Sequence, residues 1–303
     1  MSVAAPTPGA PRPSRLTGGP RQRRRKALNQ LMMVLSTLAA VIAVAALLLV
    51  IVDVVIKAAP AIKWHFITQN PSTNFLDPSG GGIANSIVGS AILIGLSSLI
   101  SIPIGILVAI YTSEFAPLRV SSFIRFALDI LNGVPTIIIG IFIYGILVIG
   151  HTQSGWAGAL ALAIVQLPIV ARSAQEVLAL VPGSLKEAGL ALGLRRWRIV
   201  TRVVLPTAIG GLITGAVLGV ARVAGETAPL LFTSSIFSNI GITTDPSQAL
   251  PNIPVTIFTL SESPTPSDHA KAWAAALVLI LFVLIVSVVA RTLNERSRRK
   301  LGN

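Results

Sequence analysis

The sequence predicts an all-α integral membrane protein with six transmembrane helices. Of its 303 residues, 53% are hydrophobic and only 12% are charged, and the mean hydropathy is +0.79. A soluble domain usually carries about 25% charged residues. Apolar runs long enough to cross a bilayer recur along the chain, and the segments between them hold most of the charge. These observations exclude a soluble globular protein.

The chain begins with a basic stretch rich in Pro, Gly, Ser and Arg, residues 1–27, which we interpret as a disordered cytoplasmic tail. Residues 28–57 are predicted to form the first transmembrane helix, because they contain a continuous apolar run from Leu31 to Val52. A cleaved signal peptide is the alternative, but its apolar region would be only about 7–15 residues long. The longer run favours an uncleaved helix.

The main membrane domain is predicted over residues 83–290. The polar segment 58–82 before it is rich in Pro and Gly and is interpreted as an external loop. Within the domain, a charged cytoplasmic loop is predicted at 182–206 and a Ser/Thr/Pro-rich external loop at 234–271, and residues 291–303 form a basic cytoplasmic tail. The five predicted spans of the domain cover about 83–111, 134–150, 156–181, 207–233 and 272–290.

The basic residues indicate the orientation of these spans. Six spans place both termini on the same side of the membrane, and 20 of the 24 Lys and Arg residues fall on that side. Only Lys57, Lys63 and Lys271 fall on the other side, and Arg222 lies within a span. Because Lys and Arg are enriched in cytoplasmic loops, both termini are predicted to be cytoplasmic. The net charge of +13 therefore reflects topology in a multi-pass membrane protein, and we expect no nucleic-acid partner.

The charged loop contains a candidate binding surface. In its segment Glu187–Trp197, the apolar residues Leu190, Leu194 and Trp197 are three or four positions apart, which predicts an amphipathic helix. Ser184 is a candidate N-cap, because Glu187 follows it by three residues. Such a helix between two spans suggests a surface for a cytoplasmic partner. The alternative is a helix that lies among the lipid head groups.

Arg222 lies within an apolar span, where a charge must be paired and must face protein or water. Glu226 follows it by four residues, the spacing at which side chains meet along a helix. Gly211, Gly215 and Gly219 form a ridge of small residues suited to close helix packing. Arg222 is nearly two turns from Gly215 and is therefore predicted to lie on this ridge, away from lipid.

A second pair, Arg172 and Glu176, follows Pro168 in the span at 156–181. Two buried cationic groups at different depths suit a path for an anion, and the planar guanidinium matches the oxygens of phosphate. The alternative is that each Arg–Glu pair is neutral and only holds helices together, with Arg172 extending to the interface.

Part of the charged loop resembles the EAA loop of ABC-importer permeases. That pattern is Glu-Ala-Ala, three residues, Gly, nine residues, Ile, one residue, Leu-Pro. The matching residues here are Glu187-Ala188-Gly189, Gly193, Val203 and Leu205-Pro206, with Gly189 and Val203 departing from the pattern. The resemblance implies that this segment contains the coupling helix that sits in a groove of an ATP-binding subunit. It also implies that Glu187 contacts that subunit and that Gly193 forms a tight turn.

Three further motifs resemble the phosphate-specific permeases of the PstA family: GGGIANSIVGS (80–90), RFALDILNGVPTIIIGIFIYGILV (125–148) and ARVAGETAPLLFT (221–233). The resemblance covers residues 80–290 and implies the type-1 ABC-importer permease fold. It implies a role in phosphate passage for Arg222, which lies in the GETAPL-type motif, whereas no motif frames Arg172. The implied partners are a second, PstC-like permease subunit, a dimer of ATPase subunits, an external phosphate-binding protein and membrane lipid.

No residues point to chemistry within this chain. It has no cysteine and no Gly-Lys pair, so a P-loop is excluded. We expect no cofactor, no metal and no enzymatic activity, with ATP hydrolysis on a separate subunit. Two alternatives remain open: a permease for another oxyanion such as sulfate, molybdate or phosphonate, and an intramembrane enzyme that acts on a lipid phosphate. The enzyme would need a general base or a metal near Arg222.

Overall fold

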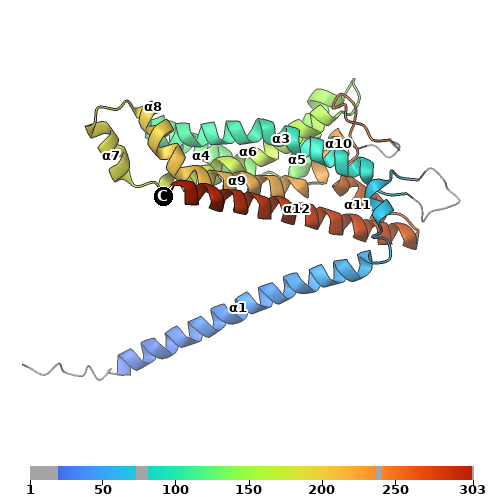
Figure 1. The fold of residues 1–303 in the computed structure, drawn as a ribbon, viewed down its shortest axis with the longest axis horizontal. Helices are drawn as coiled ribbons and strands as arrows, with labels where there is room; N and C mark the ends of the chain where they lie inside the picture. The colour runs from blue at the N-terminus through green and yellow to red at the C-terminus, as the bar shows by residue number, and fades with distance from the viewer. Residues whose placement is uncertain (1–19, 73–80, 236–240, 302–303) are drawn as a thin grey trace, which may run out of the picture. The chain divides into compact units, whose positions relative to one another are not determined.

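The computed structural model describes residues 20–72, 81–235 and 241–301, and the regular elements among them are helices. The short elements η1, η2 and η3 are π-helical turns continuous with longer helices. In chain order the elements are α1 (Pro20–Ala58), α2 (Trp64–Thr68), α3 (Ala84–Ile110), η1 (Tyr111–Phe115), α4 (Leu118–Gly133), α5 (Thr136–Ile143), η2 (Tyr144–Val148), α6 (Gly155–Ala179), α7 (Gly183–Ala191), α8 (Arg196–Ile199), η3 (Val200–Val204), α9 (Leu205–Ala224), α10 (Ala228–Thr233), α11 (Ile253–Ser261) and α12 (Pro266–Leu301) (Figure 1).

Five of the described helical segments are long and apolar enough to cross a membrane. A sixth crossing results when α4 and the segment α5–η2 are counted as one span, since they meet the same criteria together but bend by 94°. The crossings confirm the predicted all-α membrane fold. The five unbroken segments are Arg24–Ala58, Ala84–Phe115, Gly155–Ala179, Arg196–Ala224 and Pro266–Val289.

The chain divides after Asp53 into two units, and each is described by itself. The described part of the first unit is the helix α1 up to Asp53. Its apolar side chains are exposed from Leu31 to Val50. Because exposed apolar side chains are favourable only outside water, this helix has the surface of a lipid-facing span.

Both predicted tails are partly helical. Of the tail predicted over 1–27, residues 1–19 lie outside the described residues, and α1 begins at Pro20. Arg and Lys are good helix formers, so the basic run before the apolar stretch continues the helix. The predicted tail 291–303 continues α12 as far as Leu301, and residues 302–303 lie outside the described residues.

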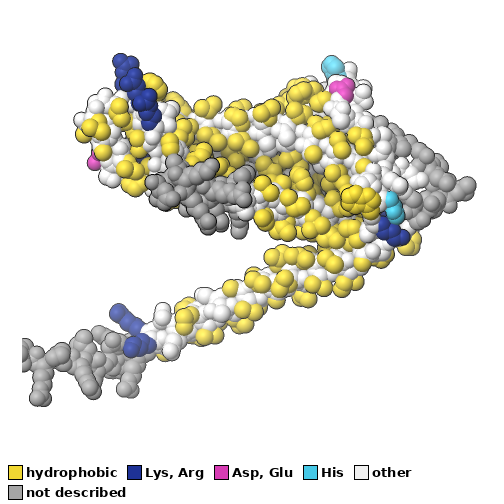
Figure 2. All heavy atoms as spheres, in the orientation of Figure 1, with side chains coloured by type: hydrophobic (Ala, Val, Ile, Leu, Met, Phe, Trp, Pro, Cys, Tyr) yellow, Lys and Arg dark blue, Asp and Glu magenta, His cyan; other side chains and the backbone are white. Residues whose placement is uncertain are grey.

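The core of the second unit lies where α6 packs against α3 on one side and α9 on another (Figure 1). Small residues allow this close approach, and Ala159, Ala161 and Ala171 of α6 are fully buried. The main apolar cluster joins Leu93 of α3, Leu162 of α6, Val223 of α9 and Leu230 of α10, among others. Figure 2 shows hydrophobic side chains over the middle of this unit and charged side chains toward its ends.

The third predicted span, 134–150, differs from the structure. The segment α5–η2 runs only from Thr136 to Val148, about 20 Å of helix. That is too short for a hydrocarbon core of about 30 Å, so the crossing also needs α4. The bend between the two helices follows from Pro135, because a proline disfavours helical backbone at the preceding residue, and Val134 has ψ 129°.

Both predicted external loops contain helices that the hydropathy pattern did not predict. In the segment 58–82 this is α2, and in 234–271 it is α11. The start of α11 has a local cause, since the side chain of Asn252 accepts a hydrogen bond from the backbone N–H of Val255 at 3.0 Å. Residues 73–80 and 236–240 of these loops lie outside the described residues. The last helix, α12, begins at Pro266, before the predicted start of its span, because proline is favoured in a first helical turn.

Candidate functional site

Arg222 lies in the last turn of α9, and its guanidinium forms an ion pair with the carboxylate of Glu226, as the four-residue spacing predicted. The two partners differ in exposure: the Arg222 side chain is 53% exposed, whereas that of Glu226 is 6% exposed. The helix ends at Ala224, so the positive charge lies at the negative end of the helix dipole, where it is stabilised. The pair therefore presents its cation at the surface of this chain and keeps its anion inside.

The predicted ridge Gly211–Gly215–Gly219 packs against α6. A Cβ atom added at these glycines would lie 2.5 Å from Val177, 2.7 Å from Ser173 and 2.8 Å from Val170, respectively. The expectation that Arg222 shares this buried ridge is wrong, because Arg222 is exposed. Its neighbour Val223 is the residue that points into the apolar core, and successive residues on an α-helix are about 100° apart.

The fifth predicted span, 207–233, is broken and not continuous. Helix α9 ends at Ala224, and the short helix α10 begins at Ala228 after the segment Gly225–Thr227. Irregular backbone at membrane depth is tolerated only where protein or a water-filled cavity surrounds it. The Arg222–Glu226 pair spans this break, so the charged groups and the irregular backbone occur together.

Two contacts fix α10 after the break. Its last turn is held to the start of α6, since the Ser154 N–H donates to the Thr233 carbonyl at 3.1 Å and the Gln153 amide donates to the Phe232 carbonyl at 3.1 Å. On another side, Gly140 of α5 lies so close to Pro229 that a Cβ there would be 2.6 Å from its Cα atom. Gln153 lies between the predicted spans 134–150 and 156–181, and its contact with α10 could not be predicted from the sequence because the two residues are 79 positions apart.

Arg172 does not pair with Glu176. Its guanidinium forms an ion pair with Asp129 of α4 and also donates to the Arg125 carbonyl at 3.2 Å and to Gln175 at 3.3 Å. Glu176 is exposed on α6. A four-residue spacing makes a pair possible but does not decide it, and α4 brings a second carboxylate within reach of Arg172. The structure therefore joins α4 to α6 through Arg172.

The amphipathic helix predicted over Glu187–Trp197 is divided in two. Helix α7 ends at Ala191, and α8 begins at Arg196. Gly193 causes the division, because its φ of +75° is a left-handed conformation that favours glycine. The Gly193 N–H donates to the Leu190 carbonyl at 2.9 Å and the Leu194 N–H to the Gly189 carbonyl at 3.1 Å, which is the hydrogen-bond pattern of a Schellman motif.

The predicted N-cap at Ser184 is wrong. Helix α7 begins at Gly183, and the residue before it is Pro182, whose ψ of 133° leads into the helix without a side-chain cap. Gly189 is buried beneath Ile199, and a Cβ added there would lie 2.9 Å from its Cγ1 atom. The departure from the EAA pattern at Gly189 thus leaves room for Ile199, which begins the apolar packing beneath the loop.

An ion pair ties α7 to the membrane helices. Lys186 Nζ lies 2.6 Å from Glu114 Oε1, and the Glu114 side chain is only 10% exposed in the turn η1 that ends α3. A cavity of about 160 Å³ adjoins the pair, and its lining includes Leu190, Arg196 and Ile199. This contact could not be predicted from the sequence, because Glu114 and Lys186 are 72 residues apart.

The outer surface of this loop is apolar and basic. Glu187 and Ala188 are exposed, as are the large side chains of Leu190, Leu192 and Trp197. The Arg198 guanidinium lies 5.3 Å from the ring centre of Trp197. Figure 2 shows Lys and Arg side chains gathered over the α8 region. The Leu205–Pro206 pair at the other end of the motif forms the first turn of α9 and does not join this surface.

Buried polar pairs join α3 and its turn η1 to α6. The Gln166 amide donates to Ser98 at 3.2 Å, and the Gln175 amide donates to Thr112 at 2.8 Å. Such hydrogen bonds stabilise helix association in a membrane. Gln166 and Gln175 are polar residues within the apolar sequence of α6. This pattern could have indicated that both side chains bind a neighbouring helix.

Asp245, in the loop before α11, is held by hydrogen bonds within its own turn. The Ser247 hydroxyl and N–H, at 2.7 and 2.9 Å, hold the pKa of Asp245 below its ordinary value, because both stabilise the carboxylate. The residues that the structure describes contain no group of three or more His, Cys, Asp or Glu placed to hold a metal ion.

Comparison with known proteins decides the family. A sequence model of the family described as "Binding-protein-dependent transport system inner membrane component" matches residues 101–299. The chain belongs to this family. It is thus a multi-pass component of a membrane transport system, in agreement with the predicted transporter subunit and not with an enzyme.

Relatives within this family are similar over most of their length. A phosphate transport system permease protein PstA of Yersinia pestis is 42% identical over 234 residues, which are 77% of each chain. A probable phosphate transport system permease protein PstA of Methanocaldococcus jannaschii is 39% identical over 79% of this chain and 84% of the relative. The predicted resemblance to PstA permeases is confirmed.

Solved structures support the fold. The chain is similar to a chain of a bacterial alginate ABC transporter with a TM-score of 0.61 and 15% identity, covering 91% of this chain and 96% of that chain. It is also similar to a chain of the MetNI methionine ABC transporter with a TM-score of 0.55 and 17% identity, covering 71% and 94%. The predicted type-1 ABC-importer permease fold is confirmed.

Proposed function

We propose that this chain is the permease subunit that carries inorganic phosphate through the cytoplasmic membrane in an ATP-driven importer. The observation that carries the proposal is the similarity, up to 42% identity over 77% of the chain, to relatives named as PstA permeases of phosphate transport systems. A second permease subunit completes the channel, a pair of ATPase subunits binds on the cytoplasmic side, and an external binding protein delivers phosphate.

Arg222 contacts the phosphate on its way through the membrane. Its guanidinium is half exposed at the break between α9 and α10, while Glu226 keeps one edge of it occupied. A planar guanidinium binds phosphate oxygens through two parallel N–H donors. Irregular backbone at this depth fits a water-filled path. Arg172 lies on another helix, and its ion pair with Asp129 joins α4 to α6. Its role is therefore to hold together the helices around the path and not to contact phosphate.

The α7–α8 surface binds the ATPase subunit. It offers an apolar centre at Leu190, Leu192 and Trp197, with arginines around it and Glu187 exposed on α7. Buried apolar and aromatic anchors supply most of the energy of such interfaces. Below the surface, the Lys186–Glu114 ion pair and the continuous run from α8 through η3 into α9 connect it to the membrane helices.

Competition between oxyanions for uptake tests which of them is the substrate. In cells that rely on this importer, uptake of radiolabelled phosphate is expected to fall only with excess unlabelled phosphate, and to remain within about twofold of its value with equal concentrations of sulfate, molybdate or phosphonate. A site that hydrogen-bonds one oxyanion discriminates against others that leave its polar groups unpaired. Stronger inhibition by another oxyanion would make that oxyanion the substrate.

Both termini lie in the cytoplasm. Two observations support this orientation: the excess of basic residues on their side in the sequence, and the bent pair α4–α5 as a sixth crossing, which makes the number of crossings even. A soluble tag at either terminus is therefore expected to resist protease added to intact spheroplasts. As a control, a protease site inserted in the loop before α11 is expected to be cut, and a cut tag would reverse the orientation.

A further inference from the structure

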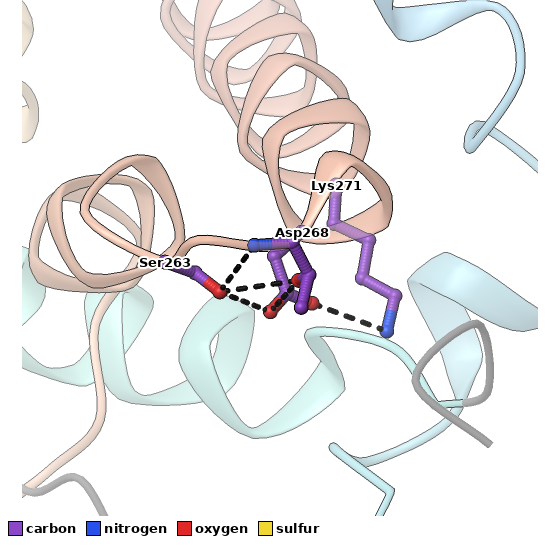
Figure 3. Close-up of polar contacts among 4 residues, drawn as sticks. Ser263, Asp268 and Lys271 are labelled. Carbon is purple, nitrogen blue, oxygen red and sulfur yellow. Dashed lines mark hydrogen bonds and ion pairs between the residues drawn. The ribbon is translucent and has the colours of Figure 1, made fainter. Parts of the chain in front are cut away.

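The charged cluster at the start of α12 finds its contacts within the chain. The hydroxyls of Ser263 and Thr265 each donate to Asp268 Oδ2 at 2.6 Å, and Lys271 Nζ lies 3.9 Å from Oδ1 of the same carboxylate (Figure 3). A buried polar group that is hydrogen-bonded in this way needs no ligand from outside. The charged cluster below the α7–α8 surface is different.

The cavity of about 160 Å³ beside α7 is lined by three charged and three apolar side chains, which are Glu114, Lys186, Arg196, Leu190, Ile199 and Val200. Glu114 and Lys186 neutralise each other, because Nζ lies 2.6 Å from Oε1. Arg196 is exposed, and among the residues that the structure describes it forms neither a hydrogen bond nor an ion pair. The lining therefore has one positive charge in excess.

Arg196 belongs to the cavity because of its place on α8. This short helix continues into η3, so Arg196, Ile199 and Val200, three and four positions apart, share one face. Ile199 and Val200 are buried, and they form the apolar floor to which Arg196 is adjacent. Arg195 and Arg198 lie on either side of this face and are not part of the lining.

The size of the cavity suits a single side chain. Pockets for drug-sized molecules have volumes of about 300–1,000 Å³. A water molecule takes about 30 Å³ in the liquid, so the volume of this cavity corresponds to about five non-hydrogen atoms. A glutamate side chain has that size. Its methylene groups would lie against Leu190 and Ile199, and its carboxylate would reach the guanidinium of Arg196.

A partner that covers the α7–α8 surface removes water from Arg196. Leu190 belongs both to this surface and to the cavity lining, so the partner also closes the cavity. A buried charge without a counter-ion is strongly destabilising. The covering surface must therefore bring a negative group to this position. A lipid phosphate would also supply negative charge, but it would place oxygen atoms against the apolar floor.

We propose that an acidic side chain of the ATPase subunit enters this cavity and forms an ion pair with Arg196. The inference rests on the proposed function, which assigns the α7–α8 surface to that subunit. A guanidinium binds a carboxylate through two parallel N–H donors, so the contact fixes orientation as well as charge. Because the Lys186–Glu114 pair lines the same cavity, the ATPase contact lies directly beside the attachment of α7 to η1.

The first test measures how fast the ATPase subunit dissociates from the complex of the full chain, its second permease and the ATPase, immobilised through the permeases. Arg196→Gln is expected to raise the rate at least about tenfold, because loss of one partner of a buried charge pair acts on dissociation. Arg195→Gln removes the same charge from the exposed rim outside the cavity and is expected to change the rate less than about threefold.

Equal effects of the two variants would overturn the inference, since they would indicate only a general attraction between the surfaces. If the unchanged chain holds an ATPase subunit and Arg196→Gln releases it no faster, the inference also fails, but the proposed function stands. If the unchanged chain holds no ATPase subunit, the proposed function itself fails.

The second test identifies the ligand of Arg196. Arg196→Lys keeps the charge and places an amine in the cavity, which a carbodiimide joins to a contacting carboxylate as an amide. We expect a cross-link between position 196 and an acidic residue of the ATPase subunit, located by mass spectrometry. The Lys186–Glu114 cross-link within the chain is the internal control. If this control forms and position 196 is joined to phospholipid, or to nothing, the inference is wrong.

Discussion

Replacing Arg222 with Lys is expected to lower phosphate uptake at least about tenfold, although the positive charge is kept. The guanidinium offers paired N–H donors in a fixed plane, and an ammonium offers a single centre of charge. Each lost hydrogen bond to a charged group costs about 1.5–3 kcal/mol, and the lower value already corresponds to a tenfold effect. The measurement is initial uptake of labelled phosphate at matched amounts of the protein in the membrane.

Arg119→Lys is a suitable control, because it makes the same change at an exposed position on α4, away from the break. Uptake in this variant is expected to be unchanged. The competing interpretation treats Arg222 only as the ion-pair partner that neutralises the buried Glu226, and lysine would serve that purpose at the same four-residue spacing. Normal uptake in Arg222→Lys would therefore establish the structural interpretation.

Lys186→Glu is expected to stop phosphate uptake while the complex continues to hydrolyse ATP. The substitution places a second carboxylate beside Glu114, whose side chain is 10% exposed, so the two like charges repel in a poorly solvated place. Helix α7 would then lose its attachment to the turn η1, although the exposed surface around Trp197 is unchanged. ATPase activity and uptake are measured on the same reconstituted preparation, and their ratio reports the coupling.

The exchanged pair Glu114→Lys/Lys186→Glu provides the control. It restores opposite charges across the same 2.6 Å contact, and uptake is expected to recover by at least about fivefold over the single variant. A contact that only stabilises the fold would lower the amount of protein without changing uptake per molecule. Equal loss of ATPase activity and uptake in Lys186→Glu would contradict a role in coupling.

Much of the architecture was predictable because a bilayer imposes length and polarity on every span. The apolar run at Leu31 to Val52 and the runs that contain α3, α6, α9 and α12 could be identified by this criterion alone. The bend at Pro135 and the helix α11 could not, because both depend on local backbone conformation inside segments of mixed polarity. Hydropathy averages over a window and does not resolve them.

An ion pair could be predicted from the sequence only where its two residues lie close together in the chain. The pair Arg222–Glu226 follows from helical spacing, but the partner of Arg172 is Asp129, which is 43 positions away, and Lys186 pairs with Glu114 at 72 positions. Such pairs are set by the packing of α4 against α6 and of the loop against η1, for which a single sequence has no signal. The resemblance to the EAA loop predicted the turn at Gly193. The observed φ of +75° explains why glycine is favoured at this position.

The α7–α8 surface continues into the helical run Arg196–Ala224, which is long compared with the thickness of a membrane. Its 29 residues extend about 43 Å, whereas the hydrocarbon core is about 30 Å thick and the whole bilayer, with its head groups, is about 40–45 Å. A run longer than the hydrocarbon core extends at one end or both into the head groups or beyond them. In the proposed importer the end at Arg196 is the one that leaves the hydrocarbon core, so an ATPase subunit that binds α7 and α8 displaces no acyl chains.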